Sequence, residues 1–152
     1  MLVLPVCLWA TLASADPDDD SHSDKGHAAE TAAPPTPAGL HVELNKLEPS
    51  DKGCRAYIVV NNLGDTTYQS YKIDLVLFQT DGVIGKRFSI DLAPLKAKKK
   101  SVKLFEIDAI QCDKIGSFLV NDVMECKAEG GPVSGCLDNL KTSTLTNVQL
   151  SK

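Results

Sequence analysis

Two of the three histidines lie where a metal ion could bind them. His22 and His27 are close in sequence to four aspartates: Asp18, Asp19, Asp20 and Asp24. Imidazole and carboxylate groups of this kind can hold Zn(II), Cu(II) or Ni(II), but the metal would have to order a flexible chain, so binding would be weak. A solvated acidic segment explains the same residues more simply. We therefore expect no metal site and no bound cofactor.

The remaining histidine and the carboxylates give little support for catalysis. His41 lies at the start of an expected strand, and a Ser-His-Asp or Cys-His arrangement needs a base placed beside its nucleophile. Seven carboxylates could pair as general acid and base, but their spacing singles out no two of them: Asp74, Asp81, Asp91, Glu106, Asp108, Asp113 and Asp122. We expect outward positions for them, although Asp108 and Asp113 leave a weak calcium site open. The sequence thus predicts a protein that is not an enzyme.

One concentrated basic feature precedes an expected strand. Lys96, Lys98, Lys99 and Lys100 form a turn that leads toward Lys103. Such a cluster can approach an anionic lipid surface or a polyanionic wall polymer, at about 1 kcal/mol per basic residue near an acidic membrane. Lysines at a turn and a strand edge are also a common protection against edge-to-edge aggregation, which explains them more simply. The four lysines of the turn are the candidate contact with an anionic surface.

Seven aromatic side chains could form a ligand-binding surface, but a core role is expected for most of them. A domain of this size has few other large residues with which to fill its interior. The seven are Tyr57, Tyr68, Tyr71, Phe78, Phe88, Phe105 and Phe118.

The first fifteen residues have the composition of a signal peptide. They form an apolar run that ends in Ala13-Ser14-Ala15, a small-x-small cleavage site. The run is too short to span a bilayer, and no second apolar span follows. A leader normally carries Lys or Arg ahead of its apolar stretch, and here none is present. We therefore expect the translation start to lie upstream of Met1.

Residues 16–39 form an acidic linker. They contain six acidic residues and one lysine but no large apolar residue, so they cannot bury enough surface to fold alone. The formal net charge of the whole chain is -4, and the remainder after this segment has 15 basic against 14 acidic residues. A nucleic-acid-binding domain needs a concentrated basic face, so this balance disfavours one.

Four cysteines remain after the expected leader, which indicates two disulfides in an oxidising compartment. They are Cys54, Cys112, Cys126 and Cys136. The alternative is four free thiols in a cytosolic protein. A structural zinc site is disfavoured, because these cysteines lack the close pairs that such a site uses. Three disulfide pairings are open from the count alone.

Short β-type runs separated by turn residues follow Leu40, and this pattern predicts a single all-β domain. We expect an immunoglobulin-like antiparallel β-sandwich of about seven strands over residues 40–126. A first strand around Leu40 stops at Glu48-Pro49-Ser50-Asp51, and a second covers 55–61. Alternation is clearest in 71–78, and the Asp81-Gly82 turn returns the chain as 83–92. Further strands are expected at 102–107 and 118–124.

Greek-key order suggests how the cysteines pair. If the strand at 55–61 runs antiparallel to the strand at 102–107, the start of one lies beside the end of the other. Cys54 would then meet Cys112, and Cys126 would pair with Cys136 across a Gly-rich loop. The second bridge would tether residues 127–152, in which 144–150 is a candidate edge strand.

Four segments of the chain together resemble a known family: Leu44 to Pro49, Gly53 to Tyr57, Asp74 to Phe78 with Asp81 to Ile84, and Lys100 to Phe105. Over residues 40–126 the chain resembles a family of exported alphaproteobacterial proteins often labelled Tat-pathway signal proteins. The resemblance implies a periplasmic address and brings no established activity or functional residue. No twin arginine precedes the apolar leader, so the export route stays open. The strand order is also similar to that of immunoglobulin-like accessory domains of bacterial envelope proteins.

These observations favour a non-enzymatic accessory domain, periplasmic or secreted, that binds an envelope protein or polymer through a sheet edge or loop. A periplasmic protein that binds a small ligand or a metal is the alternative. A secreted enzyme with an unrecognised carboxylate site is the third reading. The partner and the oligomeric state are not encoded in any motif we find.

Overall fold

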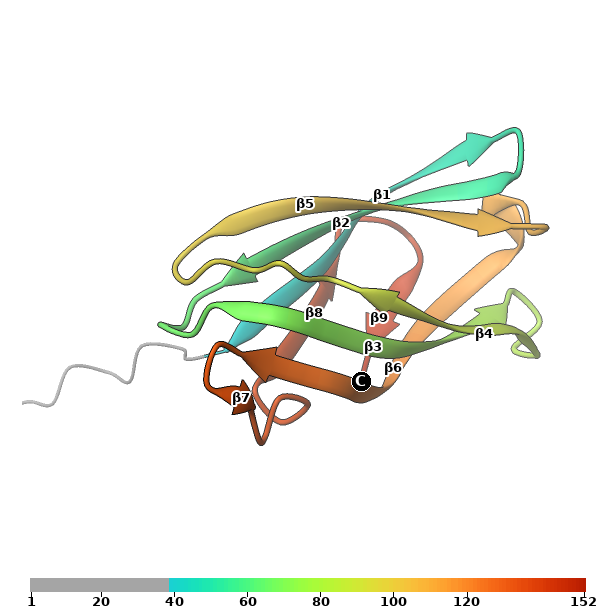
Figure 1. The fold of residues 1–152 in the computed structure, drawn as a ribbon. Helices are drawn as coiled ribbons and strands as arrows, with labels where there is room; N and C mark the ends of the chain where they lie inside the picture. The colour runs from blue at the N-terminus through green and yellow to red at the C-terminus, as the bar shows by residue number, and fades with distance from the viewer. Residues whose placement is uncertain (1–38) are drawn as a thin grey trace, which may run out of the picture. The chain divides into compact units, whose positions relative to one another are not determined.

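Strands make up nearly all of the regular structure in residues 39–152, the part of the chain that the computed structural model describes (Figure 1). A single 3-10 turn, η1 (Cys112–Lys114), precedes the longest strand. The strands are β1 (Leu40–Ser50), β2 (Gly53–Asn62), β3 (Tyr68–Gln79), β4 (Ile84–Asp91), β5 (Lys100–Asp108), β6 (Ile115–Ala128), β7 (Gly131–Pro132), β8 (Leu140–Thr144) and β9 (Gln149–Ser151). The expected leader and nearly all of the expected linker lie outside the described residues.

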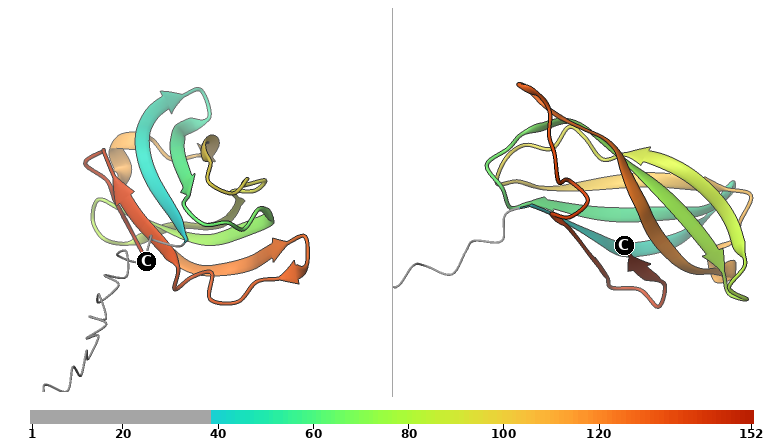
Figure 2. Two further views of the ribbon diagram at one scale, coloured as in Figure 1. Left: turned by 90° about the vertical axis from the view of Figure 1, so that its left-hand side faces the viewer. Right: turned by 90° about the horizontal axis from the view of Figure 1, so that it is seen from below.

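The strands form two sheets that enclose one apolar core. One sheet has the order β5-β2-β1-β8, and the other has the order β4-β3-β6-β7 with β9 beside β6 (Figure 2). Every pairing is antiparallel except β1 with β8 and β6 with β9. The predicted all-β sandwich is confirmed, with nine strands where about seven were expected.

Alternation of buried and exposed residues explains most strands. In β2, the buried positions are every second residue from Cys54 to Asn62. In β3, Ile73, Leu75 and Leu77 face the core as the sequence predicts, but Asp74 and Val76 on the opposite face are buried too. The outer face of β3 is therefore partly covered as well, since Arg87 on β4 and Asn121 on β6 both bond to Asp74.

The first strand is longer than predicted. We expected Glu48-Pro49-Ser50 to end it, whereas β1 continues to Ser50 and turns at Asp51-Lys52 into β2. Proline is tolerated on an edge strand. Beyond Leu44, β1 is such an edge, since its pairing with β8 ends there.

Both expected disulfides are present. Cys54 is bonded to Cys112 with a Cα–Cα distance of 5.0 Å, and Cys126 is bonded to Cys136 with a Cα–Cα distance of 6.5 Å. The first follows from the antiparallel register of β2 with β5, which places Cys54 opposite Ile107. The expected antiparallel pairing of these two strands is therefore confirmed together with the disulfide pairing.

The C-terminal segment is part of the sandwich rather than a tethered appendix. One edge strand was expected at 144–150, but β8 pairs with β1 and β9 pairs with β6, so the segment crosses from one sheet to the other. Leu140, Val148 and Leu150 are buried in the core. This crossing covers one long side of the sandwich, and β4 and β5 form the opposite side (Figure 2).

Candidate functional site

An exposed apolar patch lies on the outer face of β5 and β2. Val102 is opposite Val59, and Leu104 is opposite Tyr57, in the antiparallel register. The exposed fractions of Val102 and Leu104 are 59% and 54%. Since β5 is the last strand of its sheet, one of its backbone edges has no strand partner within residues 39–152. We call these four residues with the free edge the β5 surface.

The lysine-rich turn leads directly into the β5 surface. Lys98 is committed to the fold, because its Nζ donates to the Leu63 carbonyl at 2.8 Å and lies 3.3 Å from Asp65. Lys96, Lys99 and Lys100 are exposed, and none has a carboxylate oxygen within 4.0 Å in the described part of the chain. Three of the four candidate lysines are thus free to meet an anion beside β5.

Asn62 positions this turn, a role that no sequence pattern indicates. The side chain is 1% exposed, and its Nδ2 donates to the carbonyls of Thr66 at 2.7 Å and Lys96 at 3.0 Å. Its Oδ1 accepts a bond from the Gly64 amide at 3.2 Å. Asn62 also donates its backbone N–H to the Lys99 carbonyl. In the sequence, Asn62 directly follows the strand expected at 55–61, and no motif marks it as a buried hydrogen-bonding residue.

A polar cluster borders the β5 surface at its far end. Glu106 accepts hydrogen bonds from Arg55 and from Ser50, the latter at 2.8 Å, and these two donors hold the pKa of the Glu106 carboxyl below its usual value. The Tyr57 hydroxyl donates to Glu48 at 2.7 Å. The Tyr57 ring is therefore fixed on the outer face, whereas the sequence suggested a core position for most aromatic residues.

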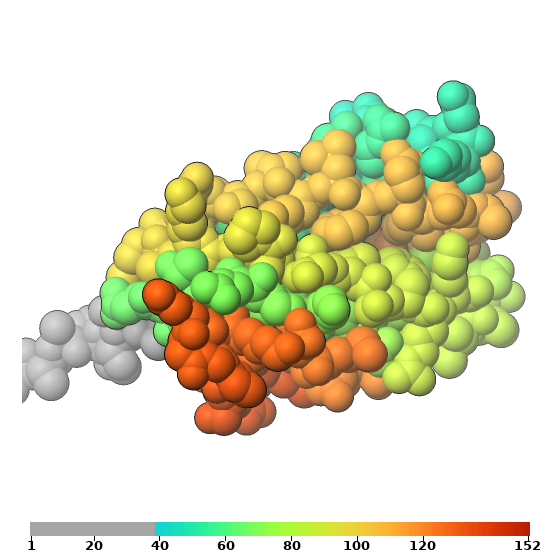
Figure 3. Space-filling view, viewed as in Figure 1, coloured from blue at the N-terminus to red at the C-terminus, as the bar shows by residue number. Residues whose placement is uncertain are grey.

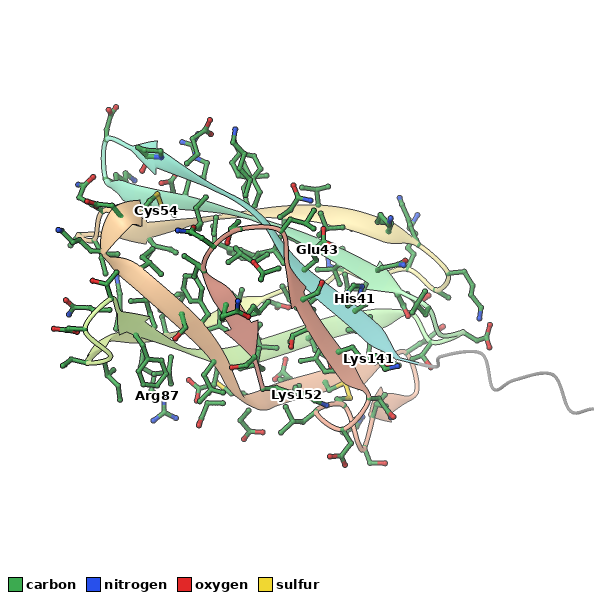
Figure 4. The ribbon with its side chains drawn as sticks, turned by 180° about the vertical axis from the view of Figure 1, so that it is seen from behind. His41, Glu43, Cys54, Arg87, Lys141 and Lys152 are labelled. Atoms are coloured by element: carbon green, nitrogen blue, oxygen red, sulfur yellow. A yellow bond between two sulfur atoms is a disulfide. The ribbon has the colours of Figure 1, made fainter. Side chains whose placement is uncertain are left out.

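His41 does contact a serine, which the sequence did not predict. Its Nε2 lies 2.8 Å from the Ser143 Oγ, across the β1–β8 pair. Figure 4 labels His41 on β1 and Lys141 on β8. Glu43 is two residues along the same strand, and Lys141 is the register partner of His41. A hydrolytic triad also requires a third group that orients the imidazole. Within residues 39–152, the Ser143 hydroxyl is the one hydrogen-bond partner of this ring, so the pair has the geometry of a cross-strand contact.

We expected an outward position for Asp74, but its side chain is buried. It is 4% exposed, and both of its oxygens accept bonds from Arg87, the closest at 2.7 Å, while Asn121 donates to Oδ2 at 2.8 Å. The hydrogen bonds from Arg87 and then Asn121 lower the pKa of the Asp74 carboxyl. The aspartate is buried because the Arg87 side chain covers it.

The other carboxylates fill local roles. Asp81 accepts from the Val83 amide, Asp91 from the amides of Tyr71 and Ala93, and Asp122 from the Val123 amide. Asp108 and Asp113 are exposed. Residues 39–152 contain no cluster of three or more His, Cys, Asp or Glu side chains suited to a metal ion. His22 and His27 lie outside the described residues.

Comparisons with protein-family models, with curated proteins and with solved structures find no match for this chain. The immunoglobulin-like strand order and the family resemblance accordingly stay predictions. No helix within residues 39–152 has the length and apolar character needed to cross a membrane.

Proposed function

We propose that this protein is a non-enzymatic binding domain of the cell envelope, periplasmic or secreted, that binds an extended acidic polypeptide segment along β5. The single observation that carries the proposal is the β5 surface. Within residues 39–152, a strand edge without a partner, exposed Val102 and Leu104, and three lysines without a carboxylate partner adjoin there. An extended peptide adds a strand to such an edge through main-chain hydrogen bonds, and its alternate side chains contact the face of the sheet.

Charge makes β5 a better candidate than the other long edge. On β4, the outward Arg87 is engaged with Asp74, so its charge is already neutralised. At β5, Lys96, Lys99 and Lys100 have no such partner in the described chain, and they favour a partner with acidic side chains. A strand edge offers N–H and C=O groups that fit a polypeptide better than a lipid or a polysaccharide.

Two observations support an exported location. Two disulfides in a small domain are typical of oxidising compartments. Residues 1–15 have signal-peptide composition, and the family that the sequence resembles is exported. A short chain that carries its own disulfides and a long acidic linker fits an accessory domain that reaches toward another envelope component.

The proposal is tested by titrating the protein with a ten-residue peptide of alternating Val and Glu while amide hydrogen exchange is followed by NMR. Strand addition should slow exchange at the free-edge amides of β5 and leave those of β8, the opposite edge, unchanged. The matched control peptide alternates Val and Lys and should bind at least tenfold more weakly. Equal binding of both peptides, or protection of β8 to the same degree, would contradict the proposal.

Two variants separate the lysines from the fold. Lys99→Glu with Lys100→Glu should abolish binding of the acidic peptide, whereas Lys127→Glu, an exposed lysine on β6, should leave it unchanged. Vesicles of anionic lipid test the alternative that these lysines bind a membrane surface. If these bind through the same lysines while the peptide does not, the site recognises a membrane surface and the polypeptide proposal fails.

A further inference from the structure

The side of the sandwich formed by β4 and β5 is held together differently from the opposite side. The C-terminal segment crosses the opposite side, whereas β4 and β5 belong to different sheets and share no strand pairing. Their surfaces adjoin along a seam that faces the viewer in Figure 3. Two side-chain contacts cross this seam: Lys86 Nζ donates to the Asp108 carbonyl at 3.2 Å, and Lys103 Nζ donates to the Ala93 carbonyl at 3.4 Å.

An apolar crevice lies beneath the seam. All the side chains around it are apolar and come from both sheets: Leu44, Ala56, Ile58, Leu75, Phe88, Ile90, Phe105, Ile107, Phe118 and Leu150. The cavity has a volume of about 20 Å³, which is enough for one water molecule but offers that water no polar partner. Phe88 and Phe105 are half-buried. Their rings thus border a dry space that reaches the interior of the sandwich.

Two lysines lie beside the aromatic residues that line the crevice, although neither lysine is part of the lining itself. Lys86 precedes Phe88 on the inward face of β4, and Lys103 precedes Phe105 on the inward face of β5. Each ammonium group contacts a backbone carbonyl, and neither has a carboxylate within 4.0 Å among residues 39–152. Lys103 has the longer contact and the more buried environment, so its charge is the less well satisfied and the less screened by water.

We propose that this crevice binds a single-chain anionic amphiphile, with the alkyl chain between the sheets and the carboxylate on Lys103. The chain would take the space of the Phe88 and Phe105 rings, and the seam between the sheets can widen to admit it because no strand pairing joins β4 to β5. A charge-assisted contact with a carboxylate then replaces the 3.4 Å contact of Lys103 with Ala93. The apolar lining excludes polar ligands, and the ammonium groups select against cationic ones.

This site goes beyond the proposed function, because it uses the inward face of β5 rather than its outer face and free edge. The probe is dodecanoate below its micellar concentration, added to the full chain. Isotope-filtered NOEs should connect its methylene protons with Ile58, Leu75 and Phe118, and none should reach Val102 on the outer face. Butyrate, which has the same head, and dodecyltrimethylammonium, which has the same tail, should bind at least tenfold more weakly.

Lysine variants test the position of the head group. Lys103→Gln should weaken dodecanoate binding about tenfold, as expected for loss of a partly buried charged contact. Lys86→Gln makes the same change at the other end of the seam and should weaken it less than threefold. Equal effects of the two variants would show only general attraction of anions to a basic edge, and would overturn the assignment.

A variant that fills the crevice provides an independent check. Phe105→Trp puts a larger ring, which is harder to displace, in the space that the chain must enter. Without any change of charge, it should reduce dodecanoate binding while the chemical shifts of β1 and β8 stay unchanged. The inward lysines could instead only protect β4 and β5 from pairing with other molecules. In that case, Lys103→Gln would increase self-association and the parent protein would show no NOE to the crevice, which would refute the proposal.

Discussion

The hydroxyl of Tyr71 donates a hydrogen bond to the backbone carbonyl of Cys136 across 2.9 Å. Tyr71 is also the register partner of Cys126 on β6, and Cys126 is disulfide-bonded to Cys136. One residue of β3 is therefore linked to both ends of the loop that the disulfide closes, because its backbone pairs with Cys126 and its side chain bonds to Cys136. The loop is fixed to the core by a polar bond as well as by a covalent one.

Tyr71→Phe should lower the free energy of unfolding by about 1–2 kcal/mol. It removes the donor and leaves the Cys136 carbonyl without that partner in a buried environment. Burial raises the pKa of the Tyr71 hydroxyl far above its usual value of 10.0. The hydroxyl must therefore stay protonated in the fold, so its contribution is complete below pH 10 and is lost at higher pH. Urea unfolding of parent and variant at neutral pH measures the difference, and equal midpoints would contradict this role.

The two disulfides should contribute unequally. They join residues separated by 58 and by 10 positions. On the chain-entropy model, removing Cys54–Cys112 by paired Ala substitutions should cost about 4 kcal/mol, and removing Cys126–Cys136 should cost about 3 kcal/mol. Chemical denaturation of the two double variants checks the order. A larger loss from the short loop would mean that its packing on Tyr71 outweighs the loop entropy.

Asn62→Ala should destabilise the protein by about 2–3 kcal/mol, because several buried backbone groups lose their partner at once. The effect should also be local. Amides from Lys96 to Lys100 should exchange faster with solvent, while those of β8 should not. Asn61→Ala, at the adjacent half-buried position, is the matched control and should change little. Uniform acceleration across the domain would show that Asn62 supports the core in general rather than the lysine-rich turn.

The contact of Asp74 with Arg87 predicts a loss of stability in acid. The folded protein holds the pKa of Asp74 below its ordinary value of 3.8, so the unfolded chain takes up this proton first as the pH falls. The stability is complete above pH 3.8 and decreases as the pH falls through the folded pKa. Asp74→Asn should reduce the steepness of this decrease in urea midpoints between pH 5 and pH 2. An unchanged slope would assign the acid sensitivity to other carboxylates, such as Glu106.

The sequence predicted the disulfide-bonded sandwich because its signals are local or countable. Alternation marked the strands, Asp81-Gly82 marked a hairpin, and the even cysteine number with Greek-key order led to the two bridges. The parallel pairings of β8 and β9 were not predicted, because both strands are short and their partners are distant in sequence. The partner of β8 lies about a hundred residues away, and the partner of β9 lies about thirty residues away. Local patterns carry no information on such distant register.

The candidate site was predicted only in part. The lysine-rich turn was visible as a run of one residue type, but the sequence could not show that Lys98 is engaged with Leu63 and Asp65. The sequence did not indicate the apolar half of the β5 surface, because Val102 and Leu104 have the pattern of ordinary strand residues. Their exposure depends on β5 being an edge, which is a property of strand order and not of composition.

The most direct measurement of the central claim is site-specific photo-crosslinking in intact cells. A photoreactive residue at position 104 lies on the β5 surface, and the same residue at position 145 is a control, because Leu145 is 70% exposed but follows β8 on the opposite edge. We predict that position 104 gives an adduct with an acidic segment of one envelope protein, that Lys99→Glu with Lys100→Glu abolishes it, and that position 145 gives none. Adducts of equal yield at both positions, or an adduct at 104 that survives the lysine changes, would contradict the account.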